Sequence, residues 1–350
     1  MKNIFQRAIS LSFLLVFFCA CNNSPIESDV QYHKTGKNTR AYGDKSPKIV
    51  TYVETDNTNP LNAGDYLLSD SSTVVDIVEL YAAYIEKRTV DGISQPILKL
   101  NDKLTRVLEP DPTAPTTTGY HKYVEPLQEK GIKVLLSVTG NWFPISFGSM
   151  NDTQTTQFAN ILAYVVDRYN LDGIGFVDKN TDNITPVEGS YGSLIGKLHN
   201  LMPSNKLITV FQWGNYNQIN MAQGALIDYA YQGYFGASAW IGSSSIPGIT
   251  NDRWSPICIN MGFSYTDDNL VNIYENAFAA AEGDYGVLMT FGIRSISDNN
   301  PQLILDMLTY GAYDDAASLA STPDNAGDRP QDWDIIPGGL TFTIDDVNGN

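Results

Sequence analysis

Aromatic and amide side chains follow several β-rich segments of this 350-residue chain. Flat aromatic rings can stack on the faces of sugar rings, and amides can pair with sugar hydroxyls. Most of the 20 tyrosines are expected to pack in the core, but several such side chains at neighbouring strand ends favour a carbohydrate site. The candidate ligand-binding residues are Glu54, Asn141, Trp142, Lys179, Gln212, Trp213, Gln232, Tyr234, Trp240, Tyr265 and Arg294, with Trp254 in a further predicted loop.

Eight short apolar segments must position these side chains. They alternate with helical stretches in which apolar residues recur every three to four positions, as Phe158, Ile161 and Val165 do. This order predicts an α/β fold, a closed (β/α)8 TIM barrel. The expected strands are 48–54, 74–85, 132–140, 171–178, 207–213, 227–235, 256–263 and 285–293, and the expected helices lie near 120–130, 153–169, 189–202, 217–225, 267–283 and 301–320.

The candidate residues follow these strands, and a TIM barrel binds its ligands at the C-terminal ends of its strands. The sequence therefore predicts that they line one barrel mouth. Two further pieces surround the barrel. Residues 86–118 read as a hairpin plus a loop, and Leu340, Phe342 and Ile344 alternate as in a short strand that docks on the barrel.

The predicted fourth strand leads into the segment DGIGFVDK, residues 172–179. Side chains two positions apart on a strand share a face. Gly175, Val177 and Lys179 should therefore point together into the barrel mouth. This set offers a hydrogen atom, an isopropyl group and an ammonium group.

The chain resembles glycoside hydrolase family 18, and within it the bacterial endo-β-N-acetylglucosaminidases that cut the chitobiose core of N-glycans. The resemblance runs from about residue 48 to 315 and is carried by YVETDNTNPLNAGDYLL, GIKVLLSVTGN, YNLDGIGFVD, IDYAYQGYFG and YGVLMTF. The family's fourth-strand signature is D-G-x-D-x-D-x-E. Its Glu protonates the leaving oxygen. The Asp two before it orients the substrate acetamido group, whose carbonyl attacks the anomeric carbon in place of an enzyme nucleophile.

This chain departs from that signature at all three functional positions. Gly175 and Val177 stand where the family has its two inner aspartates, and Lys179 stands where it has the acid. A positioned general acid contributes roughly 10²–10⁴ in rate. The ordinary pKa of a lysine side chain is about 10.4, so it would stay cationic beside a transition state that develops positive charge. The resemblance therefore implies the fold without the catalytic centre, and no catalytic residue is assigned.

Three other carboxylates could supply a relocated acid. Asp178 is one residue out of phase, so a regular strand points it to the face opposite the mouth, beside Phe176. Asp182 lies in the following loop, and Glu54 ends the first strand.

The first residues read as an export signal. Lys2 and Arg7 precede an apolar run over residues 9–21. The end of this run resembles a lipoprotein signal, which makes 1–20 the signal peptide and Cys21 the lipidated residue; an ordinary cleaved signal is the alternative. Residues 21–46 are expected to form a flexible tether, 47–320 the barrel and 321–350 an acidic C-terminal extension. The expected location is a bacterial cell envelope, lipid-anchored at the outer membrane or cell surface.

The charge of the chain restricts its partners. The net charge is −17, and removal of Lys2 and Arg7 leaves 20 basic against 39 acidic residues, or −19. Such a field repels nucleic acid and anionic membrane surfaces. A neutral oligosaccharide or glycoprotein glycan fits better, with envelope glycan-uptake proteins as possible partners and membrane contact through the lipid alone. Three scattered histidines and Cys258 in an apolar run predict no metal site, and no cofactor is implied.

Three functions remain open on this sequence. The first is an inactive, surface glycan-binding lipoprotein that captures N-glycan or GlcNAc-containing oligosaccharide. The second is an active endo-β-N-acetylglucosaminidase with a relocated acid. The third is a protein-interaction module on a barrel that has lost its sugar chemistry.

Overall fold

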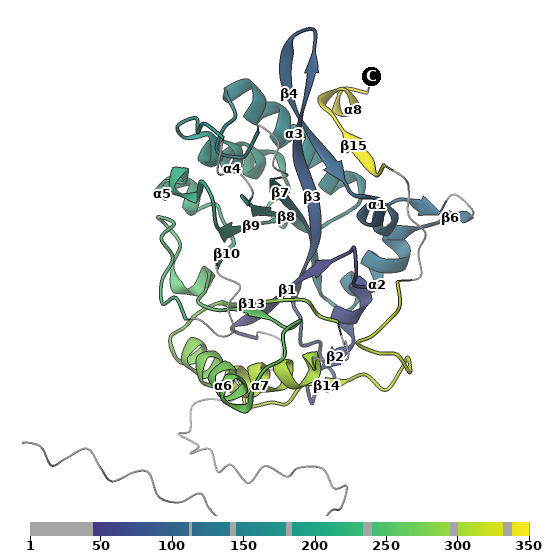
Figure 1. Ribbon diagram of the computed structural model, residues 1–350, viewed down its shortest axis with the longest axis vertical. Coiled ribbons are helices and arrows are strands. Elements are labelled where there is room, and N and C mark those ends of the chain that lie inside the picture. Colours follow the sequence, from purple (N-terminus) through teal and green to yellow (C-terminus); the bar gives the residue numbers. More distant parts are fainter. Residues whose placement is uncertain are drawn as a thin grey trace, which may run out of the picture. The chain divides into compact units, whose positions relative to one another are not determined.

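The expected (β/α)8 barrel is present in the computed structural model of the protein (Figure 1). The structure describes residues 45–111, 114–140, 145–179, 184–233, 240–294, 300–331 and 338–349, without the side chains of 111 and 114–117. Neighbouring strands of the barrel wall run parallel, in the order β11-β10-β9-β8-β7-β3-β1-β13-β12. They are β1 (Lys48–Glu54), β3 (Ile77–Val90), β7 (Lys133–Gly140), β8 (Gly173–Val177), β9 (Leu207–Gln212), β10 (Tyr229–Gln232), β11 (Trp254–Ser255), β12 (Cys258–Asn260) and β13 (Val287–Phe291).

The seventh barrel strand is divided into β11 and β12. β11 pairs with β10, and β12 pairs with β13. Pro256 lies between the two pieces and has no N–H for the ladder. Ser255 spans the gap: its Oγ accepts from the Met289 N–H at 2.9 Å and donates to the Ile257 carbonyl at 2.7 Å. The barrel is therefore nearly closed, with one hydroxyl in place of ladder bonds.

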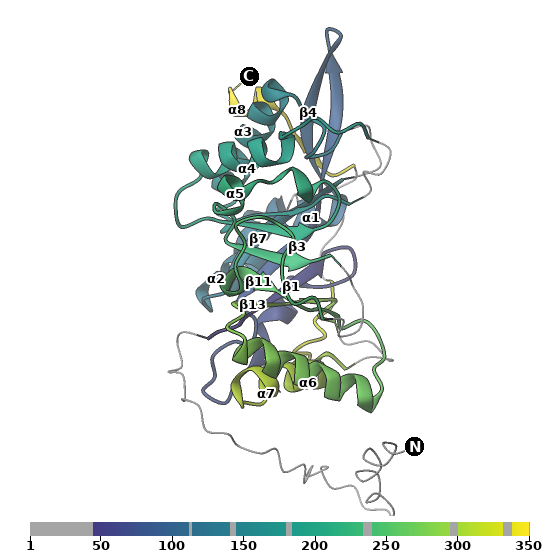
Figure 2. The same ribbon diagram turned by 90° about the vertical axis from the view of Figure 1, so that its left-hand side faces the viewer.

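Helices and helical turns follow most of the barrel strands. α6 and α7 pack side by side (Figure 2). α7 ends at Tyr313, earlier than the expected residue 320, because Asp314 adopts a left-handed conformation with φ of 58°. The helices are α1 (Asp102–Leu108), α2 (Glu125–Glu129), α3 (Asp152–Arg168), α4 (Ser190–Leu201), α5 (Met221–Gly224), α6 (Asp267–Glu282), α7 (Pro301–Tyr313) and α8 (Ile344–Val347), with the turns η1 (Pro60–Gly64), η2 (Tyr120–Val124), η3 (Tyr216–Gln218) and η4 (Asn251–Arg253).

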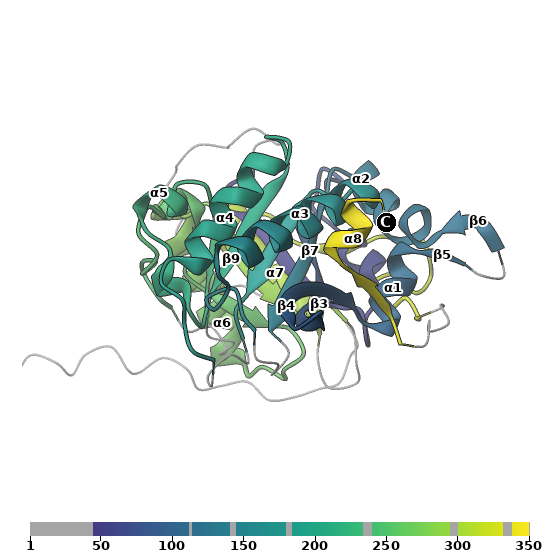
Figure 3. The same cartoon turned by 90° about the horizontal axis from the view of Figure 1, so that it is seen from above.

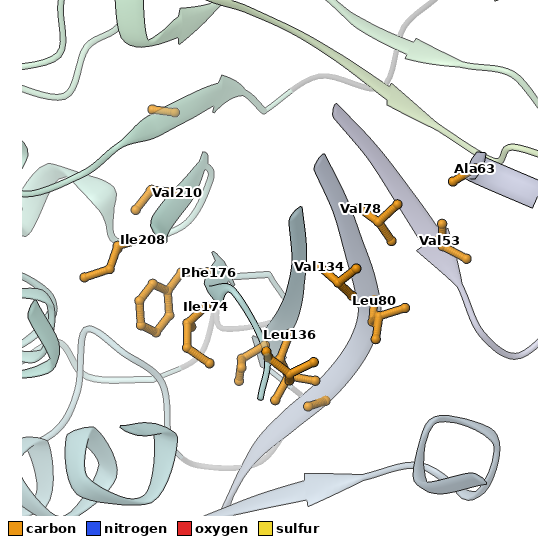
Figure 4. Packing of buried hydrophobic residues seen from close by; sticks show 14 of the residues in the cluster. Val53, Ala63, Val78, Leu80, Val134, Leu136, Ile174, Phe176, Ile208 and Val210 are labelled. Carbon is orange, nitrogen blue, oxygen red and sulfur yellow. The ribbon is translucent and has the colours of Figure 1, made fainter. Parts of the chain in front are cut away.

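Alternate residues of the barrel strands pack in two separate clusters. Outward side chains such as Val53, Phe176 and Val210 belong to the larger cluster, which also contains the apolar faces of the helices (Figure 4). Inward side chains fill the barrel. The buried members of this inner cluster are Val50, Tyr52, Ile77, Leu135, Val177, Phe211, Tyr231, Cys258, Val287 and Met289. The barrel is thus a packed core rather than a pore.

A hairpin extends from the barrel, as the sequence predicts for residues 86–118. β3 turns at Asp91 and Gly92, whose φ values are 51° and 78°, and returns as β4 (Ile93–Leu100). Two positive φ angles make this a two-residue turn of the kind that joins twisted strands. The sequence analysis missed α1, which follows the hairpin and is capped by the Asn101 side chain. A second, short hairpin joins β5 (Pro110–Asp111) and β6 (Ala114–Thr118).

Leu340 and Phe342 of the expected C-terminal strand form a strand on this hairpin, whereas Ile344 begins helix α8 instead. β15 (Leu340–Phe342) pairs antiparallel with β4. α8 follows and lies against α3 (Figure 3). Residues 338–349 are therefore attached both to the β3–β4 arm and to α3.

The segment after α7 is held against the loop that follows β1. β14 (Ser318–Leu319) pairs with β2 (Tyr66–Leu67). Arg329 then grips Asp65 with two nitrogens, at 2.7 and 2.6 Å. The Asp65 side chain is fully buried, whereas Arg329 keeps 23% of its side-chain surface. Such a bidentate pair is strong because both charges are hydrogen-bonded and one is shielded from water.

The helices of the described residues are all too short or too polar to cross a membrane.

Replacing Arg329 by alanine should lower the free energy of unfolding by about 3 kcal/mol, because it leaves the buried Asp65 carboxylate without its cation. Urea denaturation measures this loss. Arg88→Ala is the matched control, since Arg88 pairs with the half-exposed Asp345 of the same C-terminal region. It should cost about 1 kcal/mol or less. Equal losses in the two variants would contradict the assignment.

Candidate functional site

The direction of the β8 side chains decides which chemistry is available in the barrel. Val177 belongs to the inner cluster, and a Cβ built on Gly175 would point at Glu79 inside the barrel. Phe176 points outward, where its ring meets Phe147 at a centroid distance of 5.1 Å. The alternation predicted for this strand is therefore correct at these three positions. Positions 175 and 177 hold no carboxyl group, whereas the family that the sequence resembles carries aspartates there.

Lys179 follows directly after β8. The strand ends at Val177, and the Lys179 N–H donates to the Val177 carbonyl at 2.8 Å in a tight turn. The Lys179 side chain is half-buried. The position of the family's acid is thus a lysine at the strand end, in a turn rather than in the regular strand.

Asp178 faces away from the barrel interior. Its Oδ2 accepts from both the backbone N–H and the side-chain amide of Asn215, each at 2.8 Å. Burial raises the pKa of Asp178, against hydrogen bonds from Asn215 and the Phe147 backbone. Asp178 therefore ties the end of β8 to the loop after β9. This placement does not favour Asp178 as a relocated acid.

Glu79 is a buried carboxyl group that the sequence analysis did not consider. It lies on β3 between the inward residues Ile77 and Tyr81 and is fully buried. Desolvation raises the pKa of Glu79 to about 7, although hydrogen bonds from surrounding hydroxyls, Thr209 foremost, oppose the shift. The signal in the sequence was a single acidic residue within the apolar run 74–85.

An aromatic layer crosses the barrel near the strand ends. The Tyr52 ring makes edge contacts with Tyr81, Phe211 and Tyr231 at centroid distances of 6.1, 6.0 and 6.2 Å. Val177 belongs to the same cluster. Tyr52, Phe211 and Tyr231 are fully buried and close the barrel interior, whereas Tyr81 keeps part of its surface exposed. A partly exposed tyrosine ring such as Tyr81 suits the apolar face of a sugar.

Two tryptophans of the predicted rim retain exposed surface. Trp213 and Trp240 each keep 38%. The Trp213 ring lies against Gly233 at the end of β10. A Cβ built on Gly233 would lie 3.1 Å from Cε3 of this ring. The Trp240 ring meets Tyr285 edge-on at a centroid distance of 5.2 Å. Both rings are supported on one side and open on another, as stacking on a ligand requires.

Other predicted rim residues already have protein partners. The Gln212 Oε1 accepts from the Ser244 hydroxyl at 2.9 Å and the Ser245 N–H at 2.8 Å. Gln232 is fully buried. The Tyr265 hydroxyl donates to the Asn260 carbonyl at 2.7 Å. These side chains shape the loops around the mouth, and a ligand would have to displace or share their bonds.

Glu54 and Arg294 complete the described part of the predicted rim. Glu54 ends β1 in the inward phase of Val50 and Tyr52, is half-buried and accepts from the Asn57 amide at 3.2 Å. Arg294 is exposed. The sequence analysis placed Trp254 in a loop, but Trp254 lies in β11 and is fully buried.

The indole N–H of Trp254 donates to the Ile241 carbonyl at 3.0 Å. Trp254 is therefore part of the outer core and not of a rim.

Several predicted residues lie outside the described part of the chain. They are Asn141, Trp142 and Tyr234 of the predicted rim, the rescue candidate Asp182 and the predicted lipidation site Cys21. Among the described residues, no cluster of three or more His, Cys, Asp or Glu side chains could hold a metal ion. Cys258 is buried and not in a disulfide.

The chain is similar in sequence to two glycan-cleaving enzymes. It is 28% identical over 338 residues to endo-β-N-acetylglucosaminidase F1 of Elizabethkingia meningoseptica, which covers 90% of this chain and 94% of that protein. It is 27% identical over 282 residues to an endo-β-N-acetylglucosaminidase of Flavobacterium sp. (strain SK1022), covering 78% and 82%. No family model matches the chain. Its homologues are thus endo-β-N-acetylglucosaminidases, as the resemblance implied.

Solved structures share the fold. EndoBT-3987 of Bacteroides thetaiotamicron with a Man5GlcNAc product matches with a TM-score of 0.63 and 20% identity, over 83% of this chain and 67% of that chain. The same protein with a Man9GlcNAc2Asn substrate matches with a TM-score of 0.60 and 19% identity, over 83% and 72%. At this identity the likeness establishes the barrel architecture.

The Glu79 carboxyl should make stability depend on pH. Because its pKa is about 7 in the folded chain against 4.5 as its ordinary value, the protonated form stabilises the fold fully below about pH 4.5. This stability is lost as the pH rises through about 7, a change of about 3 kcal/mol between about pH 4 and 8. The Glu79→Gln variant has no carboxyl group to titrate at this position.

Urea denaturation of wild type and Glu79→Gln across this pH range isolates the Glu79 contribution from the other titrating groups. The free energy of unfolding of wild type minus that of the variant should fall with rising pH. Parallel curves would show that Glu79 titrates normally.

Proposed function

We propose that this chain, a homologue of the endo-β-N-acetylglucosaminidases, binds an N-glycan or another GlcNAc-containing oligosaccharide without hydrolysing it. The observation that carries the proposal is the inward direction of Val177 beside Gly175 on β8. The relatives named above are endo-β-N-acetylglucosaminidases, and EndoBT-3987 was solved with Man5GlcNAc and Man9GlcNAc2Asn. The ligand class follows theirs, whereas the reaction does not.

The chemistry of the substituted positions argues against hydrolysis. In the family that the sequence resembles, the aspartate at the position of Val177 orients the acetamido group that attacks the anomeric carbon. An isopropyl group can neither accept the acetamido N–H nor stabilise the positive charge that develops in the ring. At the acid position, the Lys179 ammonium adds positive charge where the transition state is already positive. Lys179 can still donate hydrogen bonds to sugar hydroxyls.

The rest of the mouth supports binding. Tyr81, which packs against the buried Tyr52 ring, keeps part of its surface exposed, and Trp213, directly after β9, offers exposed ring surface. A net charge of −17 favours a neutral ligand over nucleic acid. A site with aromatic faces and few charges near the reacting atoms can hold a sugar without a means to cut it.

The proposed cellular role follows from the N-terminal residues. Cys21 would carry lipid after removal of 1–20, and 21–46 would tether the barrel to a bacterial envelope membrane. A tether of about 25 flexible residues has a root-mean-square span of roughly 25–30 Å. The barrel would then hold glycans at the cell surface for neighbouring hydrolases and uptake proteins.

An active endo-β-N-acetylglucosaminidase with a relocated acid is the second candidate, because both sequence relatives carry that name. Glu54 is the described carboxylate best suited to it, since it ends β1 in the inward phase. If the wild-type protein cleaves a high-mannose glycoprotein and Glu54→Gln abolishes the cleavage, this candidate replaces the first.

Replacing Trp213 by alanine should weaken the binding of a high-mannose N-glycan about tenfold or more, because a supported ring face is lost. Titration calorimetry with the isolated glycan measures this. The control is Phe278→Ala, which removes an aromatic side chain of α6 that is 45% exposed, away from the strand ends.

The control should bind as the wild type does. If the wild-type protein has no affinity for the glycan, or if both variants bind equally well, the proposed glycan site at the barrel mouth is wrong.

A further inference from the structure

Gly175 lacks a side chain because Glu79 occupies its place. A Cβ built on Gly175 would lie 1.9 Å from Oε2 of Glu79, 2.6 Å from its Cδ and 2.9 Å from Oγ1 of Thr209. Gly175 has no left-handed φ angle, so its backbone does not require glycine. Glycine inside a strand usually marks a close approach of another group. Here that group is a carboxyl from β3.

The carboxyl of Glu79 is surrounded by hydroxyl groups from four other strands. Oγ1 of Thr209 on β9 donates to its Oε1 at 2.5 Å. The hydroxyls of Tyr52, Tyr231 and Ser137, on β1, β10 and β7, also interact with the carboxyl. The hydroxyls of Tyr52, Tyr231 and Ser137 lie near the carboxyl without the geometry of a standard hydrogen bond. The carboxyl is therefore the common polar centre of the barrel interior.

Tyr52 and Tyr231 belong to the aromatic layer that closes the barrel interior. The rings of Tyr52 and Tyr231 meet edge to face, with a centroid distance of 6.2 Å and an interplanar angle of 88°. Both are fully buried. Without Glu79 these two buried hydroxyls would lose the carboxyl group that they approach. The orientation of the two rings thus depends on Glu79.

We infer that Glu79 replaces, from β3, the carboxylate that β8 lacks at position 175, and that it positions Tyr52 and Tyr231 in the buried aromatic layer on which the partly exposed Tyr81 packs. Glu79 is fully buried, so it is a positioning residue and does not touch a bound glycan. The exchange of carboxylates between strands stands apart from the proposed function. The effect of Glu79 on glycan binding, by contrast, rests on the proposed function.

The exchange is tested by moving the carboxyl back. The variants are Glu79→Ala, Gly175→Asp and the double variant, and the measurement is thermal unfolding. Glu79→Ala should lower Tm by leaving a polar cavity, and Gly175→Asp should lower it by a clash. The double variant should recover at least about half of the Tm lost in Glu79→Ala, because the new carboxyl enters the vacated space.

Val177→Asp in the Glu79→Ala background is the matched control, since it adds the same side chain at the next inward position of β8. It should show no recovery. A double variant no more stable than Glu79→Ala would overturn the exchange. If Gly175→Asp alone does not fold, the comparison of the double variant with Glu79→Ala still decides the matter.

The positioning role is tested by calorimetry with the same high-mannose glycan. Glu79→Gln keeps the shape and the hydrogen-bonding capacity, so its affinity should stay within about threefold of the wild type. Glu79→Ala should bind about tenfold more weakly, and the double variant should recover most of that loss. Wild-type affinity in Glu79→Ala would overturn the positioning role. Recovered stability in a protein that never binds glycan would overturn the proposed function alone.

Discussion

The limited space inside the barrel is the constraint on which the rest of the structure depends. Inward side chains from the strands fill this space in layers, and each one excludes another. Glu79 and Gly175 show this directly, because a single added carbon at position 175 would lie 1.9 Å from the Glu79 carboxyl. One carboxylate fits at that level, and the strand that supplies it determines what the neighbouring strand can carry.

The same constraint relates the core of the barrel to its chemistry. With the carboxyl held from β3, the next inward position of β8 is filled by Val177, which packs among the aromatic rings. The Glu79 carboxyl and the hydroxyls that approach it lie among the apolar side chains of the inner cluster, and the charged side chains Glu54 and Lys179 lie at the strand ends. In the family that the sequence resembles, the position of Val177 holds the aspartate that guides the acetamido group, and here it holds an isopropyl group.

Much of the fold could be predicted from the sequence because its signals are local. The apolar runs and the helical spacing located the barrel strands to within a few residues, apart from the longer β3, and the period of two gave the correct direction for Gly175, Phe176 and Val177. The division of the seventh strand was missed because it depends on Pro256 and on a bond from Ser255 across to β13.

The features that the sequence could not predict depend on residues far apart in the chain. Glu79 meets Gly175 only through the register that β7 sets between their strands, and an acidic residue in an apolar run does not name its partner. The grip of Arg329 on Asp65 joins residues 264 positions apart. Trp254 could not be assigned to a core or a rim until the place of β11 was known.

The most direct measurement is mass spectrometry of a high-mannose glycoprotein after prolonged incubation with the wild-type protein at high concentration. The inward positions of β8 predict that every glycan is recovered intact, including the glycan that remains bound to the barrel. Release of the oligosaccharide with a single GlcNAc left on the asparagine would show that the barrel contains a working acid, and the account of binding without hydrolysis would be wrong.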